Sequence, residues 1–158
     1  MTVRLSVATA AAMNALGERL GRELLRAGDL VLLDGPLGAG KTTLTQGIAA
    51  GLGVAGPVRS PTYTVADVHA GTRSGLLHVD AWRLSSAAEL DDLDLDTDGV
   101  VTVVEWGAGR AEQLAGTHLL VRIARDGDGD ARAVELVPEG ADWATRLDAA
   151  ATRFAPEP

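Results

Sequence analysis

One stretch, residues 35–42, limits what this chain can fold into more than any other. Its letters match the pattern G-x-x-x-x-G-K-[ST] at every position: Gly35-Pro36-Leu37-Gly38-Ala39-Gly40-Lys41-Thr42. An apolar run at residues 30–33 precedes it and predicts a buried strand. Leu44, Ile48 and Leu52 follow at helical spacing, and Gly53 stands where the helix should end. Strand, glycine-rich loop and helix in this order form a phosphate-binding loop.

The chemistry of this loop assigns a role to its residues. Glycines let backbone N–H groups curl around phosphate oxygens, and the helix N-terminus adds partial positive charge. Lys41 would reach the β- and γ-phosphates of a nucleotide, and the Thr42 hydroxyl would bind Mg²⁺. Lys41 is the only lysine among 14 basic residues, at the position where a compact ammonium suits phosphates. We expect the nucleotide to contact Gly35, Gly38, Ala39, Gly40, Lys41, Thr42 and Thr43.

The composition excludes several classes of protein. The chain has no Cys, which rules out disulfides, thiolate metal sites and a Cys nucleophile. Its net charge of −8 has the wrong sign for a chain that grips nucleic acid through the phosphates. No apolar run approaches the roughly 20 residues of a transmembrane helix. We therefore expect a soluble single domain over residues 1–158, with 156–158 as a loose tail.

The remaining pattern predicts strands that alternate with helices. Residues 3–7 suit a short edge strand, and residues 58–65 begin as a loop, because Pro61 cannot sit inside a central strand, and turn to strand at Tyr63. Residues 71–75 and 126–130 suit hairpin turns. Further strands are expected at residues 76–80, 100–104, 117–124 and 131–137. The result is an α/β sandwich of the P-loop NTPase type, with a mainly parallel central sheet, flanking helices and antiparallel strands at an edge.

Three side chains are expected to start helices. Thr9 can cap a helix whose apolar residues recur from residue 13 to residue 24. Ser86 and Glu89 form a capping box before a short helix, and Asp142 can cap the last one.

Two carboxylates are expected beside the phosphate loop. Asp80 and Glu105 each end a largely apolar strand, and ligands of such sheets lie beyond the carboxyl ends of the strands. Phosphoryl transfer needs one such group to hold the metal, and can use another to orient the attacking oxygen. The candidate catalytic residues are thus Lys41, Asp80 and Glu105, and the candidate Mg²⁺ ligands are Thr42, Glu105 and Asp80. The alternative is that either carboxylate only ends a strand or caps a helix.

Other polar and aromatic residues leave alternatives open. His78 lies inside a strand and is expected to be a hydrogen-bonded core residue. Trp106 either lines the nucleotide pocket or a partner surface, or simply packs. Residues 58–65, which include Thr62, form either a connection or a switch that senses the γ-phosphate.

Four motifs together resemble one family. They are the loop at 35–42, Ser60-Pro61-Thr62-Tyr63-Thr64, His78-Val79-Asp80-Ala81-Trp82-Arg83-Leu84 and Val104-Glu105-Trp106. In this order and spacing they resemble the bacterial TsaE family, the ATPase of tRNA threonylcarbamoyladenosine biosynthesis, over about residues 7–137. In two places the chain departs from the family: Trp82 stands where Tyr is usual, and residues 107–109 replace a segment that commonly contains Pro.

The resemblance implies a cytoplasmic, Mg²⁺-dependent ATPase that works with the TsaB–TsaD pair on the tRNA adenosine beside the anticodon. It implies that this chain interacts with tRNA only through the TsaB–TsaD pair, and that no membrane is involved. It places Thr42 and Glu105 on Mg²⁺, makes Asp80 important for hydrolysis, and makes residues 60–64, with Thr62 near the nucleotide, a switch-like loop.

Three other functions compete with this one. A small-molecule kinase should show a basic lid over the phosphates, and the sequence has no Arg cluster to make one. A GTPase usually reads guanine with Asn-Lys-x-Asp, which a chain whose only Lys is Lys41 cannot contain. A nucleotide-binding adaptor with incidental hydrolysis remains open.

Overall fold

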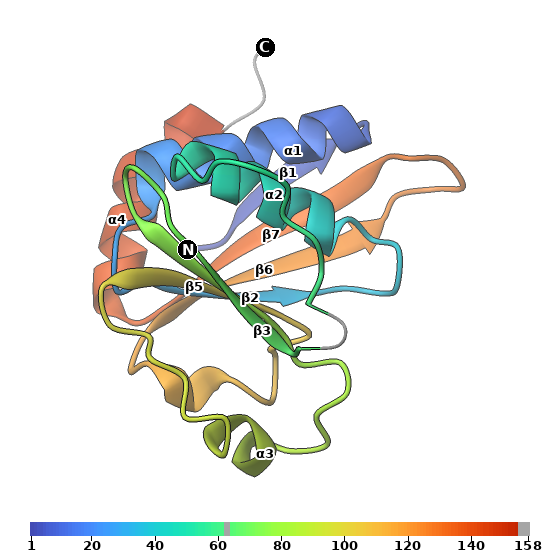
Figure 1. The fold of residues 1–158 in the computed structure, drawn as a ribbon. Coiled ribbons are helices and arrows are strands. Elements are labelled where there is room, and N and C mark those ends of the chain that lie inside the picture. Colours follow the sequence, from blue (N-terminus) through green and yellow to red (C-terminus); the bar gives the residue numbers. More distant parts are fainter. Residues whose placement is uncertain (62–63, 155–158) are drawn as a thin grey trace.

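A seven-stranded sheet forms the centre of the molecule (Figure 1). The computed structural model describes residues 1–61 and 64–154. The strands lie in the order β1-β7-β6-β2-β5-β4-β3. Their bounds are β1 (Val3–Val7), β2 (Leu30–Asp34), β3 (Ala66–His69), β4 (Gly75–Asp80), β5 (Val100–Glu105), β6 (His118–Arg125) and β7 (Arg132–Glu139).

The middle of the sheet is parallel. β2 pairs in parallel with both β5 and β6, and β4 pairs in parallel with β5. β7 and β1 are added antiparallel beside β6, and β3 is added antiparallel beside β4. The predicted fold class is therefore confirmed, with antiparallel strands at both edges of the sheet.

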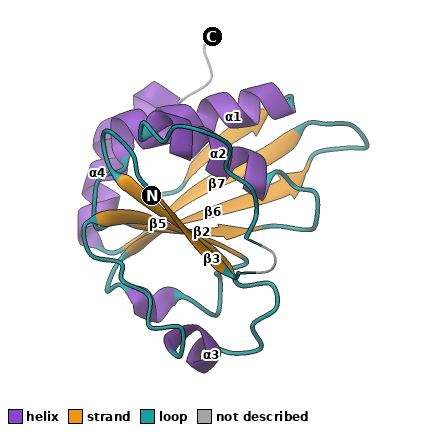
Figure 2. Cartoon of the chain, in the orientation of Figure 1, coloured by secondary structure: helices purple, strands orange, loops and turns teal. Residues whose placement is uncertain are grey.

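Helices cover the two faces unequally (Figure 2). One face carries α1 (Ala10–Arg19) with its π-helical end η1 (Leu20–Leu24), α2 (Lys41–Gly51) and α4 (Ala141–Phe154). On the other face, the described residues form only the short α3 (Ala87–Asp91) and a 3₁₀ turn, η2 (Glu112–Leu114). No helix in residues 1–61 and 64–154 has the length and apolar character to span a membrane.

Alternation along the strands explains two separate cores. In β2, Val31 and Leu33 belong to the core under α1, α2 and α4, while Leu30 and Leu32 belong to the core on the α3 side. All four are at most 2% exposed. A strand covered on both faces needs a continuous apolar run, and residues 30–33 provide one.

Helices α1 and α2 are in backbone contact. A Cβ on Gly47 would lie 2.1 Å from the Asn14 carbonyl oxygen, and one on Gly17 would lie 2.3 Å from that of Leu44. A Cβ on Gly21 or on Gly51 would likewise lie 2.4 or 2.3 Å from a carbonyl oxygen of the other helix. Since real Cβ atoms do not approach carbonyl oxygens this closely, glycine sets the spacing of this pair and so the position of α2 on the sheet.

The predicted helix starts are largely confirmed. The Thr9 side chain accepts a hydrogen bond from Ala12 N, and the Ser86 hydroxyl accepts one from Glu89 N. The Glu89 carboxylate, however, binds Ser85 N and Oγ at 2.9 and 2.6 Å, so the capping box does not close on Ser86 itself.

Three further predictions differ from the structure or fall outside it. Asp142 is wrong as a cap: it lies in the first turn of α4, which begins one residue earlier at Ala141. The predicted turn to strand at Tyr63 and the tail at 156–158 lie outside the described residues, and β3 begins at Ala66.

Candidate functional site

The phosphate-binding loop joins the end of β2 to the start of α2. Gly38 and Gly40 have φ angles of 75° and 114°, a region that favours glycine. α2 begins at Lys41, so the free N–H groups of its first turn face the space above the loop. The predicted strand, loop and helix are thus all present.

Lys41 is folded back onto its own loop. Its Nζ donates to the carbonyl oxygens of Gly35 (2.8 Å) and Pro36 (2.9 Å) and lies 3.7 Å from the centre of the Trp106 ring. The side chain is 5% exposed. Burial lowers the pKa of the ammonium, and the nearby carboxylates of Glu105 and Asp80 oppose that effect. The site therefore holds a desolvated cation ready for an anionic ligand.

Glu105 stands at the end of β5 between two hydrogen bonds. Thr42 Oγ1, in the first turn of α2, donates to Glu105 Oε1 at 2.8 Å. His78 Nε2, on the neighbouring strand β4, lies 2.5 Å from Glu105 Oε2. Glu105 is 3% exposed, and its Oε1 is the carboxylate oxygen on the side of Thr42 and the loop.

Asp80 ends β4 directly beside Glu105. The two residues are register partners across the parallel β4–β5 pair. Asp80 Oδ2 accepts from Ser60 Oγ at 2.9 Å, and Oδ1 accepts from the Trp82 backbone N–H at 3.0 Å. The predicted pair of strand-end carboxylates is therefore brought together, and Ser60 links it to the loop that follows α2.

Two tryptophans form one wall of the site. The rings of Trp82 and Trp106 are 4.4 Å apart and tilted by 49°. Trp106 has a φ of 62°, an uncommon conformation for a bulky residue, and its backbone N–H donates to Leu33 O at 3.0 Å. The Trp106 ring lies over the Lys41 ammonium. Uncommon backbone conformations of this kind often occur at functional sites.

These groups surround one cavity of about 470 Å³, a size typical of small-molecule sites. Its lining comprises Leu37, Gly38, Ala39, Gly40, Lys41, Thr42, Thr43, Ser60, Asp80, Trp82, Glu105 and Trp106. Gly35 lines an adjoining hollow of about 460 Å³ and contacts Lys41 through its carbonyl. Thr62 lies outside the described residues.

The chain offers hard oxygen donors for a divalent cation. Mg²⁺ is usually held by one or two protein oxygens together with substrate phosphates and water. The Thr42 hydroxyl and the Glu105 carboxylate meet at the end of the phosphate loop, and the Asp80 carboxylate ends the adjacent strand. The donor set therefore fits Mg²⁺ bound with a nucleotide.

Sequence reasoning missed two contacts of the site. It placed His78 in the core without its bond to Glu105, and it treated Trp82 only as a departure from a family pattern. The signal for His78 was a lone polar residue in an apolar strand, two positions before Asp80.

A glycine loop opening a helix, next to carboxylates at parallel strand ends, defines the P-loop class of α/β proteins. The family model described as "Threonylcarbamoyl adenosine biosynthesis protein TsaE" matches residues 7–134. The chain therefore belongs to the TsaE family.

Individual relatives agree with this assignment. The tRNA threonylcarbamoyladenosine biosynthesis protein TsaE of Streptomyces coelicolor is 51% identical over 142 residues, covering 84% of this chain and 95% of that protein. The protein of the same name from Mycobacterium leprae is 54% identical over 129 residues, covering 75% and 80%. The crystal structure of Bacillus subtilis YdiB matches with a TM-score of 0.79 at 27% identity, covering 97% of this chain and 95% of that one.

Proposed function

We propose that this chain is a Mg²⁺-dependent ATP hydrolase that acts with the TsaB–TsaD pair to form the threonylcarbamoyl modification on the tRNA adenosine beside the anticodon. Membership of the TsaE family supports the pathway. The observation that carries the chemistry is the bond from Thr42, at the start of the P-loop helix, to Glu105, beside the desolvated Lys41.

The loop and the start of α2 bind the phosphates. Residues 38–43 line the cavity, and backbone N–H groups in the first turn of α2 would donate to phosphate oxygens. The Lys41 ammonium exchanges its bonds to Gly35 O and Pro36 O for the β- and γ-phosphates. Such an exchange is favourable because a buried cation gains an anionic partner.

Thr42 and Glu105 would hold the metal, and Asp80, the register partner of Glu105 on the adjacent strand, would join them directly or through water. Mg²⁺, when bound, neutralises charge on the phosphate oxygens as the terminal phosphoryl group leaves. Glu105 is buried and fixed by His78, so little reorganisation is needed for it to meet a cation.

Asp80 is the residue that orients the attacking water. Its oxygens are held by Ser60 Oγ and by the Trp82 N–H, which fixes the carboxylate in the cavity wall. A carboxylate in that position accepts a hydrogen bond from water and aims the oxygen at the terminal phosphate. Since Ser60 belongs to the loop after α2, a change at the γ-phosphate also reaches that loop and provides a switch for a partner to read.

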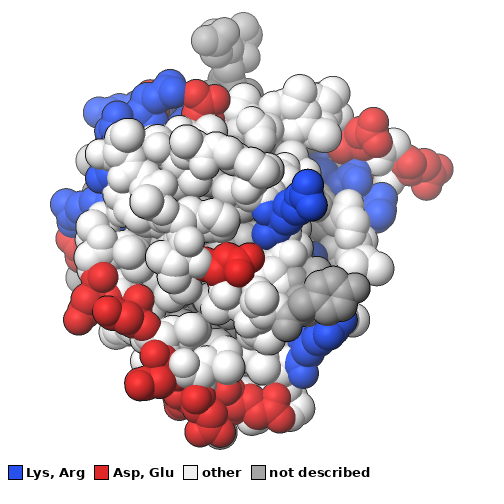
Figure 3. All heavy atoms as spheres, viewed as in Figure 1, with Lys and Arg blue, Asp and Glu red and all other residues white. Residues whose placement is uncertain are grey.

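The surface charge supports a partner as the tRNA-binding component. Acidic side chains gather below the sheet, around α3, in Figure 3; those with exposed positions there include Glu89, Asp91, Asp92 and Asp94. This charge repels the phosphates of RNA. The hydrolysis then drives a conformational change within the TsaB–TsaD assembly, and tRNA is bound through that assembly.

The test measures phosphate release and tRNA binding for the purified chain, first alone and then with TsaB and TsaD added. We expect weak, Mg²⁺-dependent hydrolysis by the isolated chain, clear stimulation by the pair, and no appreciable tRNA affinity without it at physiological salt. Hydrolysis that ignores the pair, or tight tRNA binding by this chain alone, would contradict the proposal.

A further inference from the structure

His78 is a polar residue at a buried strand position where the neighbouring residues are apolar. It lies in β4 between Leu77 and Val79, and its side chain is fully buried. Its register partner on β5 is Val103, which is also fully buried. Burying an imidazole costs free energy unless its nitrogens find partners, so the ring needs a specific reason to be there.

The hydrogen bonds of His78 are one-sided. Nε2 lies 2.5 Å from Glu105 Oε2, while Nδ1 is buried with no hydrogen-bond partner in the described part of the chain. A carboxylate can only accept, so Nε2 carries the hydrogen of this contact. The ring therefore bears the cost of an unsatisfied Nδ1, and its one side-chain hydrogen bond within the described residues is to Glu105.

That contact decides how Glu105 is presented. The carboxylate has two oxygens: Oε2 is taken by His78, and Oε1 faces Thr42 Oγ1 at 2.8 Å. Without the His78 bond, rotation about the side-chain torsions of Glu105 would be limited only by packing and by the single bond to Thr42. His78 itself does not line the cavity, so it does not reach a nucleotide or a water there.

We propose that His78 is a positioning residue: it holds Oε2 of Glu105 so that Oε1 is fixed toward Thr42 and the cation bound with the nucleotide. The inference rests on the proposed function, because it assigns His78 to the metal-binding carboxylate of that site. Loss of an outer partner of a metal ligand typically weakens metal affinity about 10- to 100-fold.

The experiment compares two substitutions. His78→Leu fills the space without a donor, while His78→Gln restores an amide N–H near the place of Nε2. Binding of a non-hydrolysable ATP analogue is measured by calorimetry over a series of Mg²⁺ concentrations and again in EDTA. Thr102→Val is the matched control, since the Thr102 hydroxyl is also buried and unpartnered in the described part of the chain, but it makes no hydrogen bond to Glu105 and Thr102 does not line the cavity.

We expect His78→Leu to raise the Mg²⁺ concentration at half-saturation by about tenfold or more. Affinity in EDTA should stay near that of the wild type, His78→Gln should recover most of the loss, and Thr102→Val should change neither. A merely structural role would instead lower affinity in EDTA and in Mg²⁺ alike, in step with the melting temperature.

Two results would overturn the inference while the proposed function stands: a wild-type Mg²⁺ titration for His78→Leu, or equal impairment of His78→Leu and His78→Gln. Analogue binding by the wild type that does not depend on Mg²⁺ would instead refute the metal site of the proposed function, and the role of His78 with it.

Discussion

Thr42 and Glu105, 63 positions apart in the sequence, are joined by a hydrogen bond of 2.8 Å. The parallel pairing of β2 with β5 brings them together, because it sets Leu33, two residues before the phosphate loop, beside Glu105. The start of α2 then lies over the end of β5. A hydroxyl and a carboxylate are thereby held together where the phosphate loop ends, which is the arrangement that a nucleotide-bound cation requires.

Glu105→Gln should therefore raise the Mg²⁺ requirement of nucleotide binding. The amide oxygen can still accept from Thr42, but the negative charge is lost, and hard cations prefer carboxylate oxygen. We expect a loss of Mg²⁺ affinity at least as large as the roughly 10- to 100-fold typical of an outer partner. Equilibrium dialysis of labelled nucleotide at graded Mg²⁺ concentrations measures it. An unchanged requirement would remove Glu105 from the metal site.

Lys41→Ala should abolish productive ATP turnover. Lys41 is the only lysine, and its Nζ lies within the loop at 2.8 Å from Gly35 O. No other side chain of the same kind can replace it on the phosphates, so we expect a loss of about 10²-fold or more in steady-state phosphate release. Lys41→Arg should stay impaired, because a planar guanidinium does not fit the place of a compact ammonium. Hydrolysis at the wild-type rate by Lys41→Ala would refute the phosphate-loop assignment.

Asp80→Asn should reduce hydrolysis much more than binding. The amide keeps the size of the carboxylate but is a poor acceptor for the proton of a water, so turnover should fall by roughly 10²-fold. Nucleotide affinity should change little, since the loop and Lys41 are untouched. Single-turnover phosphate release and nucleotide affinity are measured on the same preparation. Ser60→Ala, which removes the bond to Oδ2 and leaves the Asp80 carboxylate in place, is the comparison and should show a smaller loss.

Much of the site could be predicted because its parts are local. The glycine loop is a contiguous motif, and Asp80 and Glu105 stand at the ends of recognisable apolar strands. Parallel strands bring their carboxyl ends to one edge, so proximity follows from the topology. The bond between His78 and Glu105 did not follow, because it needs the register of β4 on β5 and the choice of one rotamer among several.

The packing of the helices could not be predicted for a similar reason. Gly17 and Gly47 look like weak points in their helices when each segment is considered alone. Only the crossing of α1 on α2 shows that both are required at the contact. The pairing of Arg146 with Asp29, 117 positions away, likewise depends on where α4 docks.

Gly47→Ala should destabilise the protein although alanine is the better helix former. Its Cβ would lie 2.1 Å from Asn14 O and 3.0 Å from Glu18 N, so α1 and α2 must move apart. Such overpacking typically costs about 1–3 kcal/mol, against a gain of at most about 1 kcal/mol in helix propensity. Urea denaturation measures the net loss. Gly116→Ala, where a Cβ meets nothing within 4 Å, is the control. Equal stability of the two variants would contradict the close contact.

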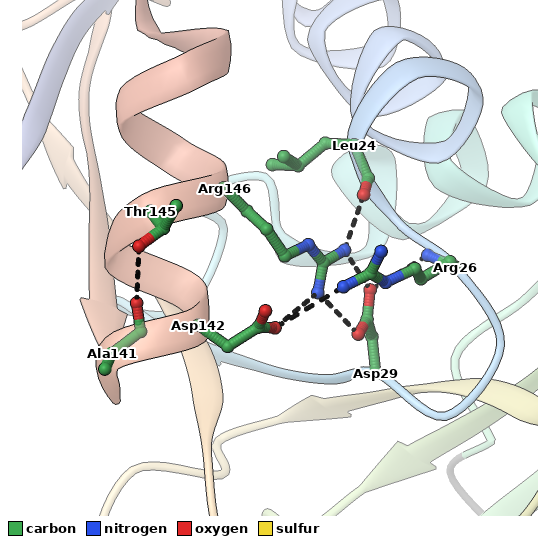
Figure 4. Close-up of polar contacts among 7 residues, drawn as sticks. All are labelled: Leu24, Arg26, Asp29, Ala141, Asp142, Thr145 and Arg146. Atoms are coloured by element: carbon green, nitrogen blue, oxygen red, sulfur yellow. Dashed lines mark hydrogen bonds and ion pairs between the residues drawn. The ribbon is translucent and has the colours of Figure 1, made fainter.

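Arg146→Met should loosen the docking of α4 (Figure 4). The Arg146 guanidinium binds both Asp29 oxygens at 2.8 and 2.7 Å and Leu24 O at 2.7 Å, and the Asp29 contact raises its pKa. The charged form is thus favoured in the fold, and its contribution is present throughout the physiological pH range. Both side chains of the pair are nearly buried, at 12% and 10% exposure, so removing one leaves an uncompensated charge at a cost of about 3 kcal/mol. A chain of this size should then melt about 6–12 °C lower.

Adding Asp29→Asn should restore part of that loss, whereas Arg153→Met, at an exposed position of the same helix, should stay within about 0.5 kcal/mol of the wild type. Nucleotide binding should be unchanged in all three variants. An Arg146→Met melting temperature equal to that of Arg153→Met would show that the pair adds nothing to the docking of α4.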